Sequence, residues 1–174
     1  MPKSSKKKIE EDEKKLLAIL GKNSNENIDK IAKKCGFSRQ KVWRIIKRLE
    51  SNKTIWGYHA VVDTEKIKKK SFIMLLTRTQ DPLGEKIQKI IKSSADEIGK
   101  KLEVTVSHNS YLHGVYDWMI CFTADDIRHA KKFSELITNE FSDYIREITL
   151  LEEIFPLRKC QMVNPNMRKI EQYF

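Results

Sequence analysis

Basic and polar residues cluster with helical spacing between Ser38 and Lys53. In this stretch Val42, Ile45, Ile46 and Leu49 follow the i, i+3, i+4, i+7 spacing of one helix face. A helix over 39–51 would bury these four side chains and expose the others. Arginine recognises guanine, and glutamine adenine, at base edges in the DNA major groove. The pattern predicts a DNA-reading helix. Its candidate DNA-binding residues are Ser38, Arg39, Gln40, Lys41, Trp43, Arg44, Lys47, Arg48 and Lys53.

Position along this helix separates two kinds of contact. Arg39 and Gln40 lie in the first turn, where side chains reach base edges. Arg48 and Lys53 are better placed for phosphates, which position a protein on the duplex without reading its sequence. Trp43 on the open face has three interpretations: contact with a thymine methyl group, contact with a sugar, or packing against a neighbouring wing.

The charge distribution supports a polyanion partner. The chain of 174 residues has a net charge of +10, and residues 1–70 carry an excess of basic residues. Residues 71–155 hold more acidic than basic side chains, and residues 156–174 are again basic. A nucleic-acid-binding module joined to a domain with another role has this distribution. A lysine-rich solvated surface is the alternative interpretation.

The elements that must position the reading helix can be predicted from its flanks. Residues 1–8 are expected to form a basic disordered arm, and a helix is expected from Ile9 behind the acidic run 10–13. Asn27 is suited to cap a second helix, and Gly36 to end it with a positive φ. Ser38 then caps the third helix, although a full capping box is absent.

Residues 54–62 are rich in β-forming side chains around one glycine and predict a small hairpin or wing. We therefore expect residues 9–62 to be a winged helix-turn-helix domain. A lysine-rich linker over 63–70 follows.

The second half of the chain changes from helical to mixed periodicity. The order of its segments is β-α-β-β-α-β, the ferredoxin-like arrangement, so the expected class is α+β. Residues 71–155 would form four antiparallel strands with two helices on one face and leave the other face to a partner chain. The basic extension 156–174 has no predicted place. The expected segments are 72–76 (strand), 83–98 (helix), 102–106 (strand), 116–122 (strand), 127–141 (helix) and 145–155 (strand).

The cysteines and histidines do not form a recognisable metal or disulfide motif. The three cysteines are far apart with no CxxC pair. His108, His113 and Cys121 lie close in sequence, but their spacing fixes no ligand geometry. We expect Cys121 to be a core thiol instead, and we predict no metal, no cofactor and no catalytic residue.

A family resemblance is carried by the segments Ile31–Ser38, Val42–Glu50 and Ile55–Asp63 and by the later turn Gly114–Asp117. The chain resembles the Lrp/AsnC family of leucine-responsive and related regulators over about residues 10–155. That resemblance implies dimerisation through the ferredoxin-like domains, often higher assembly, and an amino acid bound between subunits near Gly114. The effector-binding residues it implies are Leu112, His113, Gly114, Tyr116 and Asp117.

The sequence therefore favours a sequence-specific regulator of transcription, not an enzyme, that binds double-stranded DNA as a homodimer or a larger even-numbered oligomer. An effector site at the Asn109–Asp117 turn and a plain tight hairpin there remain equal alternatives. A siroheme decarboxylase-like enzyme of the same architecture and an architectural DNA- or RNA-binding protein are the other readings. No stretch approaches the roughly 18 apolar residues of a membrane span, so we expect a cytoplasmic protein.

Overall fold

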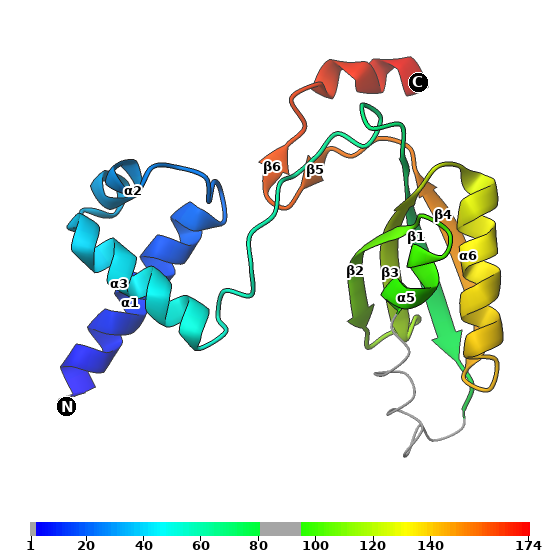
Figure 1. Ribbon diagram of the computed structural model, residues 1–174, viewed down its shortest axis with the longest axis horizontal. Helices are drawn as coiled ribbons and strands as arrows, with labels where there is room; N and C mark the ends of the chain where they lie inside the picture. The colour runs from blue at the N-terminus through cyan, green and yellow to red at the C-terminus, as the bar shows by residue number, and fades with distance from the viewer. Residues whose placement is uncertain (1–2, 81–94) are drawn as a thin grey trace. The chain divides into compact units, whose positions relative to one another are not determined.

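The computed structural model describes residues 3–80 and 95–174 (Figure 1). The chain divides into two compact units. The first combines Met1–Val61 with Leu157–Phe174, and the second is Val62–Pro156. The C-terminal extension therefore belongs to the same unit as the N-terminal helices, a place that its sequence did not predict.

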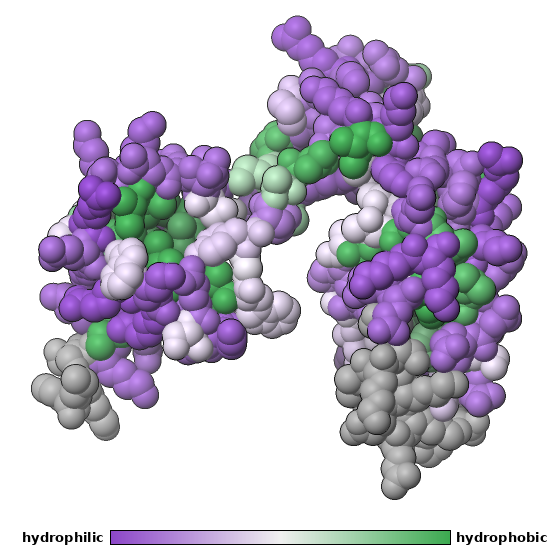
Figure 2. All heavy atoms as spheres, viewed as in Figure 1, coloured by the Kyte–Doolittle hydropathy of each residue, from purple (hydrophilic) through white to green (hydrophobic). Residues whose placement is uncertain are grey.

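Three helices form the body of the first unit: α1 (Lys3–Leu20), α2 (Ile28–Cys35) and α3 (Arg39–Ser51). Their apolar stripes meet in one core, so burial of these side chains holds the helices together. Hydrophilic side chains cover much of the outside of these helices (Figure 2). The buried core residues are Leu16, Leu20, Ile31, Ala32, Cys35, Val42, Ile45 and Leu49.

The predicted caps of α2 and α3 are present. The Asn27 side chain accepts a hydrogen bond from the Asp29 amide at 2.9 Å, and the Ser38 hydroxyl accepts one from the Lys41 amide at 3.2 Å. Gly36 ends α2 with a φ of 64°, the left-handed conformation that glycine adopts without steric cost. These caps fix the turn between the two helices.

Two local expectations about the first unit were wrong. Helix α1 begins at Lys3, so the expected disordered arm is helical from that residue and the acidic run 10–13 lies in the middle of the helix. Residues 54–62 contain no strand, so the expected wing hairpin is absent from the described chain. A β-rich composition favours an extended backbone, but a hairpin also needs a partner strand with matching hydrogen bonds.

The C-terminal extension contains a short hairpin and a 3₁₀ helix. Strands β5 (Arg158–Lys159) and β6 (Met162–Val163) pair in antiparallel fashion, and η2 spans Met167–Tyr173. The two residues between the strands, Cys160 and Gln161, have φ values of 44° and 67°. Positive φ at both central residues is the pattern of a type I′ hairpin turn.

The second unit is a four-stranded antiparallel sheet in the order β2-β3-β1-β4, the order of a ferredoxin-like fold. Helices α5 and α6 pack on the same face of the sheet (Figure 1). The core between them includes Phe72, Phe122 and Phe133, whose rings stack or meet edge to face. The elements are β1 (Lys70–Arg78), α5 (Ala95–Lys100), β2 (Thr105–Tyr111), β3 (Trp118–Ala124), α6 (Ile127–Glu140) and β4 (Ile145–Glu153).

Two segments of the second unit differ from expectation or lie outside the description. Strand β2 begins at Thr105, not at Leu102, because Glu103 has a φ of 56° and interrupts the extended backbone. Most of the helix expected over 83–98 falls outside the described residues, and α5 is its described end.

The sheet face opposite the helices carries several large apolar side chains that are only half-buried or exposed. Strand alternation places them together, since residues of one parity face the core and their neighbours face away. The outward-facing apolar residues are Ile73, Leu75, Met119, Cys121 and Leu151.

In the part of the chain that the structure describes, no helix is both long and apolar enough to cross a bilayer.

Candidate nucleic-acid interface

One face of α3 points five of the predicted DNA-binding side chains into solvent. Trp43 is 58% exposed although its indole ring is large and apolar. An exposed apolar side chain surrounded by cations is suited to double-stranded DNA. The phosphates of DNA are negatively charged, and the methyl groups of thymine offer an apolar contact in the major groove. The five exposed residues are Arg39, Gln40, Trp43, Arg44 and Lys47.

Two other candidates, Lys41 and Arg48, are bound to carboxylates of α1. Lys41 Nζ lies 2.6 Å from Asp12 Oδ2, and Arg48 Nε lies 2.8 Å from Glu13 Oε1. Lys41 also lies over the ring of Phe37, 3.9 Å from its centroid. Both cations are half-buried, so they stabilise the packing of α3 on α1. The acidic run 10–13 was expected in the first turn of a helix, so its pairing with the cations of α3 was not predicted.

The exposed cations of α3 have weaker partners. Arg39 Nε lies 3.6 Å from Asp29 Oδ1, and Lys47 Nζ lies 2.9 Å from Glu50 Oε2. Ion pairs in water contribute little free energy, so a phosphate can replace these carboxylates at small cost. The hydrogen bond from Lys47, and then that from the Tyr58 hydroxyl, lower the pKa of Glu50. Glu50 therefore stays ionised and ties the segment after α3 to the end of the helix.

The remaining two candidates lie at the ends of α3. The Ser38 hydroxyl is occupied as the helix cap. Lys53, just after the helix, has a φ of 60°. The turn that contains Lys53 is closed by a hydrogen bond from the Ile55 amide to the Leu49 carbonyl at 3.0 Å. The side chain of Lys53 is exposed. The C-terminal end of α3 thus presents one cation on a left-handed turn.

The expected effector turn lies between β2 and β3 in the second unit. Leu112 and Tyr116 are half-buried, whereas His113 and Gly114 are exposed. Gly114 has a φ of 156°, and a Cβ at this position would meet no atom within 4 Å. The glycine is therefore required by its backbone conformation and not by a close neighbour.

Asp117 is engaged by the end of strand β1. Its Oδ2 accepts a hydrogen bond from the Arg78 amide at 2.9 Å, and its Oδ1 lies 3.5 Å from Arg78 Nε. The Asp117 amide donates to the Leu76 carbonyl at 2.9 Å. Asp117 thus closes the β1–β3 end of the sheet, and Arg78 is a partner that sequence analysis did not identify.

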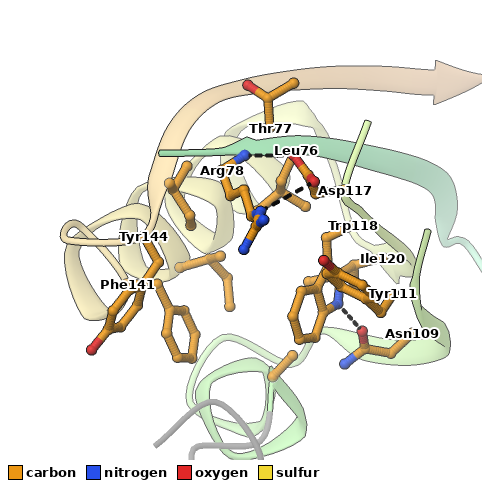
Figure 3. Close-up of a pocket in the computed structure, with 13 residues that line it drawn as sticks. Leu76, Thr77, Arg78, Asn109, Tyr111, Asp117, Trp118, Ile120, Phe141 and Tyr144 are labelled. Atoms are coloured by element: carbon orange, nitrogen blue, oxygen red, sulfur yellow. Dashed lines mark hydrogen bonds and ion pairs between the residues drawn. The ribbon is translucent and has the colours of Figure 1, made fainter. Parts of the chain in front are cut away.

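A cavity of about 60 Å³ lies beside this ion pair (Figure 3). Its wall is mostly apolar, and the indole nitrogen of Trp118 donates to the Asn109 side chain at one side. Phe141 from the end of α6 lies across the cavity from Trp118, and the Arg78 side chain points toward the space between them. An apolar chamber with a charged pair at its margin is suited to a small amphipathic molecule.

The histidines and cysteines near this turn do not assemble into a metal site. Among the described residues, no group of three potential metal ligands comes together. Cys121 is opposite His108 in the β2–β3 register, but the ring of His108 bonds the Ser110 hydroxyl at 2.7 Å. Cys121 lies on the outward face of β3 and is half-buried, so the expected core thiol was misplaced. Burial raises the pKa of the Cys121 thiol above its ordinary value.

A sequence family and one curated relative match the N-terminal part of the chain. The family of winged helix-turn-helix DNA-binding domains matches residues 13–55. An uncharacterised HTH-type transcriptional regulator of Bacillus subtilis, YugG, is 38% identical over 60 residues, 34% of this chain. The match spans only 36% of that relative's length.

Solved structures of regulators match nearly the whole chain. An AsnC family transcriptional regulator from Agrobacterium tumefaciens has a TM-score of 0.63 at 20% identity, covering 90% of this chain and 97% of its own. The leucine response regulatory protein LrpA of Mycobacterium tuberculosis scores 0.63 at 16% identity, with coverages of 88% and 98%. A Neisseria meningitidis regulator in complex with L-Met scores 0.63 at 14% identity, with coverages of 90% and 97%. Residues 13–55 therefore match the winged helix-turn-helix DNA-binding domains, and the chain has the fold of these solved AsnC/Lrp-type regulators.

Proposed function

We propose that this protein is a transcription regulator that reads double-stranded DNA with helix α3. The observation that carries the proposal is the exposed face of α3, on which Arg39, Gln40 and Trp43 project from a capped, well-packed helix. Such a helix presents donors and acceptors to a major groove without losing its own core. The proposal assigns no catalytic residue.

The proposal includes a two-fold dimer. One chain supplies one reading helix, and the apolar outward face of the sheet is suited to a second copy, because an isologous contact would bury both faces at once. Two reading helices related by a two-fold axis would recognise two half-sites of a pseudo-palindrome. The oligomers proposed are a dimer or an even-numbered multiple.

Selection of bound DNA from a random pool tests the function directly. A regulator should enrich a discrete motif with two related half-sites, and footprinting should show discrete protection. Continuous coating of DNA without an enriched motif would support an architectural role instead. Absence of DNA binding at low salt would contradict both.

We also propose that a small amphipathic effector, such as an amino acid, acts at the Asp117 end of the second unit. The cavity beside Arg78 and Asp117 supports this site, and the L-Met complex of the Neisseria regulator shows that one protein of this fold binds an amino acid. A carboxylate would pair with Arg78 and an ammonium group with Asp117. The turn residues Leu112, His113, Gly114 and Tyr116 would border the ligand between subunits.

Thermal melting with each amino acid at millimolar concentration tests the effector site. A ligand that binds only the folded protein should raise the Tm, and Asp117→Asn should abolish that shift. Asparagine retains an oxygen that can accept from the Arg78 amide but removes the charge, so DNA binding without ligand should persist. If the unsubstituted protein shows no shift with any amino acid, the turn is only a structural hairpin.

A further inference from the structure

The C-terminal extension is seated on the DNA-binding unit at one close contact. A Cβ placed on Gly21 would lie 2.9 Å from the side-chain nitrogen of Gln161, so Gln161 covers this glycine closely. Gly21 is the first residue after α1 and begins the connection to α2. The hairpin β5–β6 therefore touches the loop that leads into the first helix of the helix-turn-helix.

The hairpin turn has a conformation that its residues do not favour by themselves. Neither Cys160 nor Gln161 is glycine or asparagine, yet both have positive φ. The Gln161 carbonyl accepts a hydrogen bond from Arg158 Nη1 at 3.0 Å, and its side chain packs on Gly21. These contacts hold the turn in place against the loop.

The extension also concentrates positive charge on this unit. Residues 157–174 contain four basic residues and one acidic residue, Glu171. With them, the first unit carries 20 Lys/Arg and 8 Asp/Glu, whereas the second carries 14 and 16. Arg158 and Arg168 are exposed. All of the excess positive charge of the protein thus belongs to one folded unit, because the second unit has more acidic than basic residues.

The location of this charge indicates its partner. In a helix-turn-helix complex the first helix crosses the DNA backbone, and amides at helix N-termini contact phosphates. Here that helix is α2, and the loop 21–27 leads to its N-terminal end. We propose that residues 157–174 form a second, phosphate-contacting part of the DNA interface, beside the backbone that passes α2. This inference rests on the proposed function.

Charge removal in the full chain gives the first test. Arg168→Gln with Lys169→Gln removes two adjacent exposed cations from η2, and Lys131→Gln with Lys132→Gln removes a matched exposed pair from α6. Each lost phosphate contact should lower the slope of log affinity against log salt by about one unit. We expect a shallower slope and several-fold weaker binding for the η2 pair only, with the preferred DNA sequence unchanged.

The outcomes separate the two proposals. If the unsubstituted protein selects a DNA motif but the η2 pair and the α6 pair give equal salt slopes, the extension is only a structural strap and this inference fails. If the unsubstituted protein binds no DNA, the proposed function fails first. A change in the selected motif for the η2 pair would also overturn the phosphate assignment.

Cys160 allows a second test that does not depend on charge. It is exposed at the tip of the hairpin, whereas Cys35 is buried. An iron–EDTA reagent attached to Cys160 in a Cys121→Ser protein should cut bound DNA at discrete backbone positions beside the selected motif. The Cys160→Ser, Cys121→Ser protein provides the background. A stable complex with no cuts above that background would place the hairpin away from DNA and overturn the inference.

Discussion

The cations of α3 fall into two classes when each side chain is followed to its partner. Arg39, Arg44 and Lys47 face solvent, whereas Lys41 and Arg48 reach back to carboxylates of α1. A cation that already has a half-buried partner gains less from a phosphate, because it must first lose that partner. The solvent-facing class should therefore dominate DNA recognition.

Substitutions in the first turn of α3 should change which sequence is preferred. Loss of a good base contact costs about 1–3 kcal/mol at that base pair, so Arg39→Ala or Gln40→Ala should relax the selected motif. Lys53→Ala should instead weaken binding to all sequences alike and lower the salt slope by about one unit. Selection and salt titration of the three variants provide the measurement. Uniform weakening by all three would mean that α3 does not enter the groove as proposed.

Thr77 offers a stability test on β1. Its side chain is 7% exposed, and its hydroxyl has no hydrogen-bond partner in the described part of the chain. A buried hydroxyl without a partner loses its hydrogen bonds to water and gains none in the folded protein. Thr77→Val should therefore raise the free energy of unfolding by about 1 kcal/mol. Denaturant unfolding measures the change.

Thr79→Val is the matched control for this prediction. The Thr79 hydroxyl donates to the Asp143 carbonyl at 3.2 Å, so its removal should destabilise or leave stability unchanged. A loss of stability in Thr77→Val would show that the Thr77 hydroxyl has a partner in the assembled protein.

At the scale of elements, α6 depends on a charged cap. Asp126 Oδ1 accepts from the amides of Arg128 and His129 at 2.9 and 3.0 Å. The backbone hydrogen bond from His129, followed by the side chains of His129 and Arg128, lowers the pKa of Asp126 far below its ordinary value. The ionised carboxylate is thus the form that the folded helix stabilises.

This cap predicts a pH dependence of stability. Because the folded pKa is lowered, the stabilisation is complete above the ordinary carboxyl pKa and is lost as the pH falls toward the folded value. Asp126→Asn should therefore flatten the acid side of the Tm profile below about pH 4. Near pH 7 asparagine should still cap the helix, so the helix content should be unchanged. An unaltered acid limb in the variant would exclude Asp126 as its source.

Sequence predicted some elements well and others poorly, for identifiable reasons. The spacing of Val42, Ile45 and Leu49 predicted α3, since a buried stripe and a Ser38 cap act within a few residues of each other. The wing hairpin predicted over 54–62 is absent, because β-forming residues do not by themselves specify a partner strand. The position of the extension could not be predicted either, because Gln161 and Gly21 are in contact but lie far apart in the sequence.

For the candidate site, sequence identified the exposed face of α3 but not which cations are already paired. Helical periodicity says which side a residue faces. It does not say that Asp12 and Glu13 lie opposite Lys41 and Arg48. The same limit explains why Asp117 was predicted as a ligand residue without its partner Arg78 on another strand.

For the whole molecule, the outward apolar face of the sheet predicts self-association. Leu151 on β4 is 45% exposed on this face, so Leu151→Lys should place a charge in the proposed dimer contact and shift light scattering toward a monomer. Ile127→Lys on α6 is the matched control, since Ile127 is 38% exposed outside that face. A stable monomer of the unsubstituted protein that still selects DNA would contradict the dimer.

The return of residues 157–174 to the first unit has a consequence for how the protein is made on the ribosome. The three N-terminal helices emerge first and hold their own core, but the strand pair that seats on Gly21 is translated only after the entire second unit. A chain released early at Pro156 would contain the reading helix without the four basic residues of the extension. If the extension contacts phosphates as proposed, translation of residues 157–174 would strengthen DNA binding several-fold, so chains that stop before them would compete poorly for the sites of longer chains.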